Sequence, residues 1–206
     1  MALTKGTTQK SHRWMLIGLL ISGLLVLAAL PAISAKKVKD ETIEATAMGT
    51  GTQMGQMIGI SVEIYEYSTP EERQALLDAF AKGQNQGLVN ALTKMHAVGH
   101  ISITGTLGYD LAFIKMIPTP TGRKIRFVTN RQLRFGEVWA DAQSTSFNLT
   151  AGEFDIDDTD KTKSTGVLYP ECQLVIDKQG QLQIELTQNA WKLVDVIDWK
   201  GTAGVN

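Results

Sequence analysis

Length, composition and charge limit the class of protein before any motif is considered. The chain has 206 residues, with 20 Lys and Arg against 21 Asp and Glu and a formal net charge of −1. This balance argues against a nucleic-acid partner, because such a partner needs a basic surface. The single cysteine, Cys172, excludes an intramolecular disulfide. Because it lies just before the apolar run 174–176, we expect its thiol to be buried; the alternative is a disulfide between two chains.

The N-terminal residues have the features of a signal peptide. Residues 1–13 contain three basic side chains and no acid, and residues 14–30 form an uncharged run rich in Leu and Ile. Pro31 follows, and then small residues as far as Ala35. Signal peptidase substrates show this order of a basic region, an apolar region and small residues. The pattern therefore predicts an exported protein, periplasmic or secreted.

An uncleaved membrane anchor is the alternative, since a spanning helix needs about 20 apolar residues. Pro31 shortens the helical part, which favours cleavage, after either Ser34 or Ala35. We therefore predict a signal peptide over residues 1–35 and a single mature domain over 36–206. The protein would be held at a membrane only if the segment stays attached. Loss of the three basic residues changes the net charge from −1 to −4.

Alternation of apolar and polar residues dominates the predicted mature domain. The clearest runs cover residues 60–66, 101–104, 124–127, 173–176 and 182–187. Such alternation is typical of strands with one buried face. The last two runs are separated by a short segment with Asp and Gly, which predicts a β-hairpin. Strands of this kind, joined by short turns, favour antiparallel pairing.

Two helices are predicted between the first strands and the rest. Thr69-Pro70-Glu71-Glu72 has Thr as N-cap, Pro at the first helical position and Glu three residues after the cap. Gly83 is a plausible end of this helix, and a second helix is expected over about 88–95. The predicted fold class is α+β: an antiparallel sheet or sandwich with a two-helix insertion after the first one or two strands.

Three motifs resemble sites that carry chemistry. His96 and His100 are four residues apart, but no Glu lies between them and Gly99 interrupts the helix that would align them on a metal. The glycines of 49–55 have the wrong spacing for a dinucleotide site and precede a strand. The acidic run 153–160 lacks most of the ligands of a calcium loop. We therefore predict no metal, no cofactor and no catalytic residue from linear motifs.

Charge segregation is the most suggestive feature. No acid occurs between Asp110 and Glu137, and this stretch contains several cations. The candidate ligand-binding residues are Arg123, Lys124, Arg126, Arg131 and Arg134. Arginine forks suit carboxylate and phosphate groups. Two alternatives remain open: the cations pair with the acidic stretch 153–160 on a neighbouring strand, or they protect a sheet edge from aggregation.

Four stretches resemble a family of exported bacterial proteins of unknown function. They are Gly105-Thr106-Leu107-Gly108-Tyr109-Asp110-Leu111, Gly122-Arg123-Lys124-Ile125-Arg126, Thr129-Asn130-Arg131 and Phe135-Gly136-Glu137, preceded by the helical segment Thr69-Pro70-Glu71-Glu72-Arg73 with Leu76-Leu77. The resemblance covers about residues 58–199 and implies export and a β-rich domain. It implies no mechanism. Asn130-Arg131-Gln132 stands where the family has Asp-Arg-Pro.

The sequence thus favours a non-enzymatic, exported binding or envelope-associated module. Its partner would be an anionic ligand or a protein bound through the basic stretch. A small periplasmic hydrolase, with scattered carboxylates and His96 or His100 in its site, is the alternative.

Overall fold

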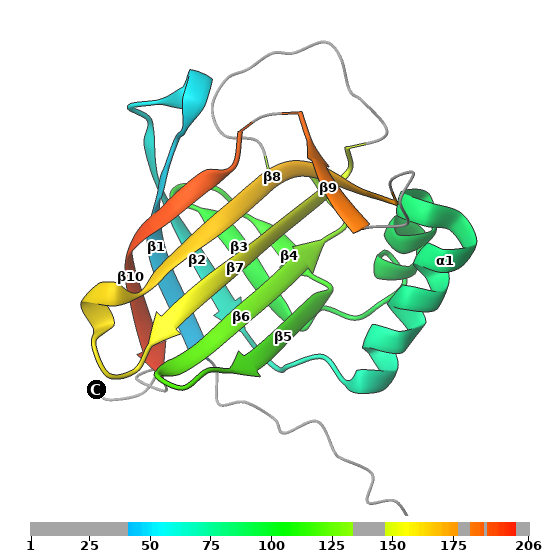
Figure 1. The fold of residues 1–206 in the computed structure, drawn as a ribbon, viewed down its shortest axis with the longest axis horizontal. Coiled ribbons are helices and arrows are strands. Elements are labelled where there is room, and N and C mark those ends of the chain that lie inside the picture. Colours follow the sequence, from blue (N-terminus) through cyan, green and yellow to red (C-terminus); the bar gives the residue numbers. More distant parts are fainter. Residues whose placement is uncertain (1–40, 134–146, 177–181, 188, 201–206) are drawn as a thin grey trace, which may run out of the picture. The chain divides into compact units, whose positions relative to one another are not determined.

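The computed structural model describes residues 41–133, 147–176, 182–187 and 189–200. In these residues ten strands form one antiparallel sheet that curves until it is nearly closed (Figure 1). The strands are β1 (Glu41–Met48), β2 (Met57–Ile64), β3 (Gly99–Ile103), β4 (Tyr109–Leu111), β5 (Phe113–Pro118), β6 (Gly122–Thr129), β7 (Leu149–Asp157), β8 (Thr165–Ile176), β9 (Leu182–Leu186) and β10 (Trp191–Lys200). The helical elements are α1 (Pro70–Leu92) and the short 3₁₀ turns η1 (Gly51–Gln53) and η2 (Lys161–Lys163).

The order of strands explains why the sheet curves into a barrel-like form. Neighbours run β4-β3-β2-β1-β10-β8-β7-β6-β5, and β9 pairs with β8 outside this path. The two ends of the order, β4 and β5, are consecutive in the chain and are separated only by Ala112. One short stretch of backbone therefore pairs with β3 through its first part and with β6 through its second. The covalent link between the two ends brings the sheet close to closure.

Alternation along the strands builds the core. In β1 the side chains of Ile43, Ala45 and Ala47 are buried and their neighbours are more exposed. Phe127 of β6 and Phe154 of β7 lie inside the sheet with their ring centroids 5.8 Å apart. Gly152 is the direct cross-strand partner of Phe127, and the ring of Phe127 occupies the space that a side chain at this glycine would need.

Helix α1 forms a second core against the sheet. Leu76, Leu88 and Leu92 of the helix pack in one cluster with Leu149 of β7 and Cys172 of β8. The predicted N-terminus of this helix is confirmed. The side chain of Thr69 accepts a hydrogen bond from the Glu72 amide, and the Glu72 carboxylate accepts one from the Thr69 amide, which together form a capping box.

The predicted α+β class with a two-helix insertion is wrong. The described residues are mostly β-strand, with one α-helix beside a nearly closed sheet. Gly83, the expected helix end, is instead a kink within α1, where Gly83 has φ −136° and Gln84 has φ 50°. The chain continues as helix because Asn85, directly after the kink, is anchored to the sheet: its Oδ1 accepts from the Leu174 amide at 2.9 Å.

Most of the predicted strands are confirmed. The alternating runs at 60–66, 101–104, 124–127 and 182–187 lie largely within β2, β3, β6 and β9. The predicted pairing of 173–176 with 182–187 is confirmed by the antiparallel register of β8 and β9. Burial of Cys172 is confirmed as well. That burial raises the pKa of its thiol to about 12, so the group stays protonated and unreactive at neutral pH.

Replacement of Gly152 tests the packing at the centre of the sheet. An ideal Cβ at this position would lie 2.3 Å from Cζ of Phe127, which is fully enclosed in the core. We expect Gly152→Val to lower the free energy of unfolding by about 1–3 kcal/mol, as overpacking does elsewhere, measured by urea denaturation. Gly83→Ala is the control, because a Cβ there meets nothing within 4 Å. Equal stability of both variants and the parent would contradict this packing.

Candidate functional site

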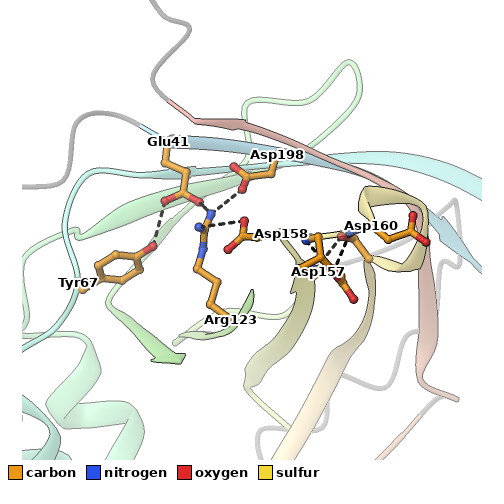
Figure 2. A network of polar contacts seen from close by, with 9 residues as sticks. Glu41, Tyr67, Arg123, Asp157, Asp158, Asp160 and Asp198 are labelled. Carbon is orange, nitrogen blue, oxygen red and sulfur yellow. Dashed lines mark hydrogen bonds and ion pairs between the residues drawn. The ribbon is translucent and has the colours of Figure 1, made fainter. Parts of the chain in front are cut away.

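An ion cluster fills one end of the sheet interior (Figure 2). Arg123 alternates with the buried residues Ile125 and Phe127 of β6, so its side chain also points inward. Its Nη2 lies 2.5 Å from Glu41 Oε1 and 2.5 Å from Asp198 Oδ2. Neither β1 nor β10 pairs with β6 in the sheet. The guanidinium therefore joins strands across the interior.

A β-bulge delivers one of the two carboxylates. The β1–β10 register shifts between Glu44 and Thr46, and on β10 Asp195 has φ 51°. Before the shift Trp191 and Leu193 are the buried positions of β10, whereas after it Val196 is buried. The extra residue thus changes which positions face inward. Asp198 shares the face of Val196, and without the bulge it would face outward.

Tyr67 connects this cluster to the loop before α1. Its hydroxyl donates to Glu41 Oε2 at 3.0 Å, and Asp158 Oδ1 lies 3.8 Å from Arg123 Nη1. Burial, together with the negative charge of Glu41, raises the pKa of Tyr67 well above its ordinary value. Burial by itself disfavours the charged form of Arg123, but Glu41 and Asp198 outweigh it and raise the pKa of the guanidinium. At neutral pH Tyr67 therefore remains a hydrogen-bond donor and Arg123 remains a cation.

The outward side of β6 carries a second set of ion pairs. Lys124 Nζ lies 2.9 Å from both Glu153 Oε1 and Asp155 Oδ2 of β7, and Arg126 Nε lies 2.5 Å from Glu153 Oε2. Burial opposes ionisation of Glu153, but the hydrogen bonds from Arg126 and Lys124 outweigh it and lower its pKa. The predicted pairing of the basic stretch with the acidic stretch 153–160 is confirmed for these residues.

The five candidate ligand-binding residues therefore have different surroundings. Arg123, Lys124 and Arg126 contact carboxylates of this chain, as described above. Arg131 is exposed and lines a cleft of about 220 Å³ with Asn130, His96 and Asp110 among its walls. Arg134 lies outside the described residues. The structure does not bring the four described residues together in one site, and the role of all five in ligand binding stays a prediction.

The two histidines belong to separate contacts. His96 Nε2 lies 2.6 Å from Glu66 Oε1, and its Nδ1 lies 3.8 Å from Glu72 Oε1. His100 of β3 faces Asp110 through Nδ1 at 3.3 Å and the Leu107 carbonyl oxygen through Nε2 at 2.8 Å. Every ring nitrogen thus faces an acceptor, which leaves none directed at a nucleophile. This geometry gives no support to the hydrolase alternative.

Asp157, near the end of the acidic run, makes its hydrogen bonds within its own turn. Asp157 Oδ1 accepts from the amides of Thr159 and Asp160 and from the Thr159 hydroxyl, and these bonds lower the pKa of Asp157. Residues 158–164 form the turn between β7 and β8 that contains η2, and Figure 2 shows this turn beside the ion cluster. Across the described ranges, no group of three or more His, Cys, Asp or Glu side chains is placed to hold a metal.

A larger cleft of about 360 Å³ lies between the start of α1 and β5. Arg73 and Lys115 supply its cations, and Phe113, Met116 and Pro70 supply apolar wall. The remaining lining residues are Tyr67, Ser68 and Thr69. Its volume falls within the range of about 300–1,000 Å³ typical of small-molecule sites.

The backbone holds this cleft in shape. The Ser68 amide donates to the Ile114 carbonyl at 2.8 Å, and the Ile114 amide donates to Ser68 Oγ at 3.1 Å. The loop before α1 is therefore tied to β5, and Tyr67 ties the same loop to the ion cluster. Sequence reasoning did not find this cleft. Lys115 belongs to the acid-free stretch, but nothing in the linear sequence links it to Arg73.

Comparisons with known proteins place the chain in no family: it matches no protein-family model, no curated protein and no solved structure. The resemblance to exported bacterial proteins therefore stays a prediction. In the part of the chain that the structure describes, no helix combines the length and apolarity needed to span a membrane.

Removal of the Arg123 charge tests the ion cluster. Arg123→Met leaves two buried carboxylates without their cation, so we expect a loss of about 3 kcal/mol in unfolding free energy at pH 7. The loss should shrink as the pH falls, because protonation removes the uncompensated charges. Urea denaturation at several pH values measures both effects.

Arg126→Met is the matched control on the same strand. The side chain of Arg126 is 59% exposed, and exposed pairs contribute only about 0–1 kcal/mol. A cost at Arg123 no larger than at Arg126, or one independent of pH, would contradict the structural role of the cluster.

Proposed function

We propose that the protein is a non-enzymatic binding module for a small anion with an apolar part, bound in the cleft between α1 and β5. The observation that carries this proposal is the surplus of positive charge there. Among the described residues neither Arg73 nor Lys115 forms an ion pair. No acidic side chain lines the cleft. Two cations beside an apolar wall match an anionic head group joined to an apolar body.

Strand register adds a second argument. Lys115 of β5 stands directly opposite Arg126 of β6, and like charges in directly opposed positions are destabilising. The carboxylate of Glu153 is already bound to Arg126 and Lys124. Lys115 therefore lies beside Arg126 without a carboxylate of its own among the described residues, and positive charge is in excess at this position. A bound anion would relieve this repulsion.

The outward-facing cations of β6, Lys124 and Arg126, are less suited to bind a ligand. An anion there would have to displace carboxylates that are already in place at 2.5–2.9 Å. This cost does not arise at Lys115 and Arg73. The proposed ligand is thus the same kind of anion that the basic stretch suggested, but its site is at Arg73 and Lys115, which form no ion pair with another described residue.

Calorimetric titration with octanoate and octyl phosphate tests the proposal. We expect octanoate and octyl phosphate to bind. Octanol lacks the charge and acetate lacks the apolar part, so these two compounds should bind much more weakly. Lys115→Met or Arg73→Gln should each weaken octanoate binding about tenfold or more, because a hydrogen bond to a charged group contributes roughly 1.5–3 kcal/mol.

Arg131→Gln is the matched control, since Arg131 lines the other cleft. It should leave octanoate binding unchanged. Loss of binding in Arg131→Gln with retention in the Lys115 variant would move the anion site to the smaller cleft. Absence of binding by both octyl anions would refute the proposal.

We also propose that the module acts outside the cytoplasm. The order of basic residues, apolar run, Pro31 and small residues in 1–35 supports this location. Intact-mass analysis of the protein from an exporting bacterial host should find a chain that starts at Lys36 or Ala35. Leu20→Arg, which interrupts the apolar run, should leave the precursor uncleaved in the cells. A mature protein that retains residues 1–35 in the membrane fraction would indicate an anchor instead.

A further inference from the structure

Three exposed methionines occur among residues 48–57, at the end of the β1–β2 hairpin. Met48 is 38% exposed, Met54 80% and Met57 62%. The other described methionines line the two clefts: Met95 is half-buried, and Met116 is 37% exposed. In Figure 1 this hairpin end, with η1, projects beyond the neighbouring strands. Methionine is among the residues most often buried, so this exposure calls for a physical reason.

The register brings two of the side chains together. Met48 of β1 and Met57 of β2 are direct cross-strand partners. Ala47 is buried and Ile58 packs against the core, so Met48 and Met57 both occupy the outward face. Side chains in such positions have Cβ atoms about 4.5–5.5 Å apart. Met54 lies in the connecting turn, three residues before Met57.

The turn itself is well held. The Gly49 amide donates to the Gln56 carbonyl at 2.9 Å, and the Met54 amide donates to the Gly51 carbonyl at 3.2 Å. The Thr50 hydroxyl donates to the Ala190 carbonyl at 2.5 Å, which ties the turn to the residues before β10. These hydrogen bonds hold the backbone at Met48, Met54 and Met57 in place. Each side chain keeps three rotatable bonds with which to adjust its sulfur.

The ligands available at this hairpin end select a particular class of ion. Residues 48–57 include no Asp, Glu, His, Cys, Lys or Arg, and the charged side chain opposite Met48 on β10 is the exposed Lys192, which is a cation and not an oxygen ligand. A hard cation such as Mg²⁺ or Ca²⁺ finds no carboxylate there, whereas neutral, polarisable thioethers suit Cu(I). A thioether needs no deprotonation and cannot form a disulfide, so its binding does not depend on pH or on an oxidising compartment in the way that a thiolate's does.

We infer that Met48, Met54 and Met57 form a binding site for Cu(I), with three thioether sulfurs as ligands. The site is separate from the proposed anion cleft and does not depend on it. Its residues come from β1, β2 and the turn between them, whereas the cleft is built from β5 and the start of α1.

Silver(I) is a suitable probe, because it is a soft, monovalent, diamagnetic ion that is stable in air. The purified protein, labelled with ¹³C at the methionine methyl groups, is titrated with silver nitrate and followed by NMR. We expect the methyl resonances of Met48, Met54 and Met57 to shift together and to saturate at one equivalent. Those of Met95 and Met116 should not move. Shifts at other methionines, or none at one equivalent, would overturn the inference.

Methionine-to-leucine variants give an independent test with Cu(I) itself, held reduced and measured by competition with a colorimetric chelator. Met54→Leu should weaken Cu(I) binding by at least about tenfold, since even residues outside the ligand set can contribute 10–100-fold to metal affinity. Leu keeps the apolar volume. Because Met54 is 80% exposed, the substitution should leave the thermal unfolding temperature unchanged, and this measurement checks that the variant is folded. Met95→Leu is the control and should bind as the parent does. Equal affinity of Met54→Leu and Met95→Leu would refute the site, and octanoate binding should survive in both.

Discussion

The inward position of Arg123 is the constraint on which much of the structure depends. A guanidinium inside a protein must be paired, because an isolated buried charge is very costly. The strands next to β6 in the sheet do not supply the carboxylates. Glu41 of β1 and Asp198 of β10 supply them from across the interior. Closure of the sheet and satisfaction of this charge are therefore linked, and the bulge at Asp195 is the local change that makes Asp198 available.

Because successive side chains of β6 face opposite sides of the sheet, the cations of this one basic stretch have different partners. Arg123 faces the interior, while Lys124 and Arg126 face outward and bind the carboxylates of β7. The acid-free segment in the sequence thus reflects sheet pairing more than a ligand surface, since the acids that match it lie on the next strand. Cations at the periphery, Lys115 and Arg73, fall outside this matching. That is why we propose the anion site there.

Local rules predicted the local features and failed where the answer depended on distant residues. Period-two alternation identified β2, β3, β6 and β9 because one face of each strand packs inward, and the capping box at Thr69 was readable because its partners lie three residues apart. Gly83 was read as a helix end, since the sequence does not show that Asn85 would be anchored to β8. Closure through Ala112 left no trace in the pattern, because it requires β4 and β5 to pair with strands at opposite ends of the sheet. The cleft was missed for the same reason: Arg73 and Lys115 are separated in the chain and meet only in the fold.

Tyr67 separates two regions of opposite charge. Its side chain lines the cationic cleft, yet its hydroxyl donates to Glu41 in an interior cluster where the carboxylates outnumber the guanidinium. Ionised tyrosine would add a further negative charge to that cluster and would repel an anion in the cleft. The raised pKa of Tyr67 keeps the group neutral, so its ring can serve as uncharged wall on one side while its hydroxyl hydrogen serves the cluster on the other. Charges in a partly buried setting are screened less than charges at the surface. An ionised Tyr67 would therefore repel nearby negative charges more strongly here than on an exposed strand. The same hydrogen bond that completes the interior cluster therefore also preserves the electrostatic character of the cleft.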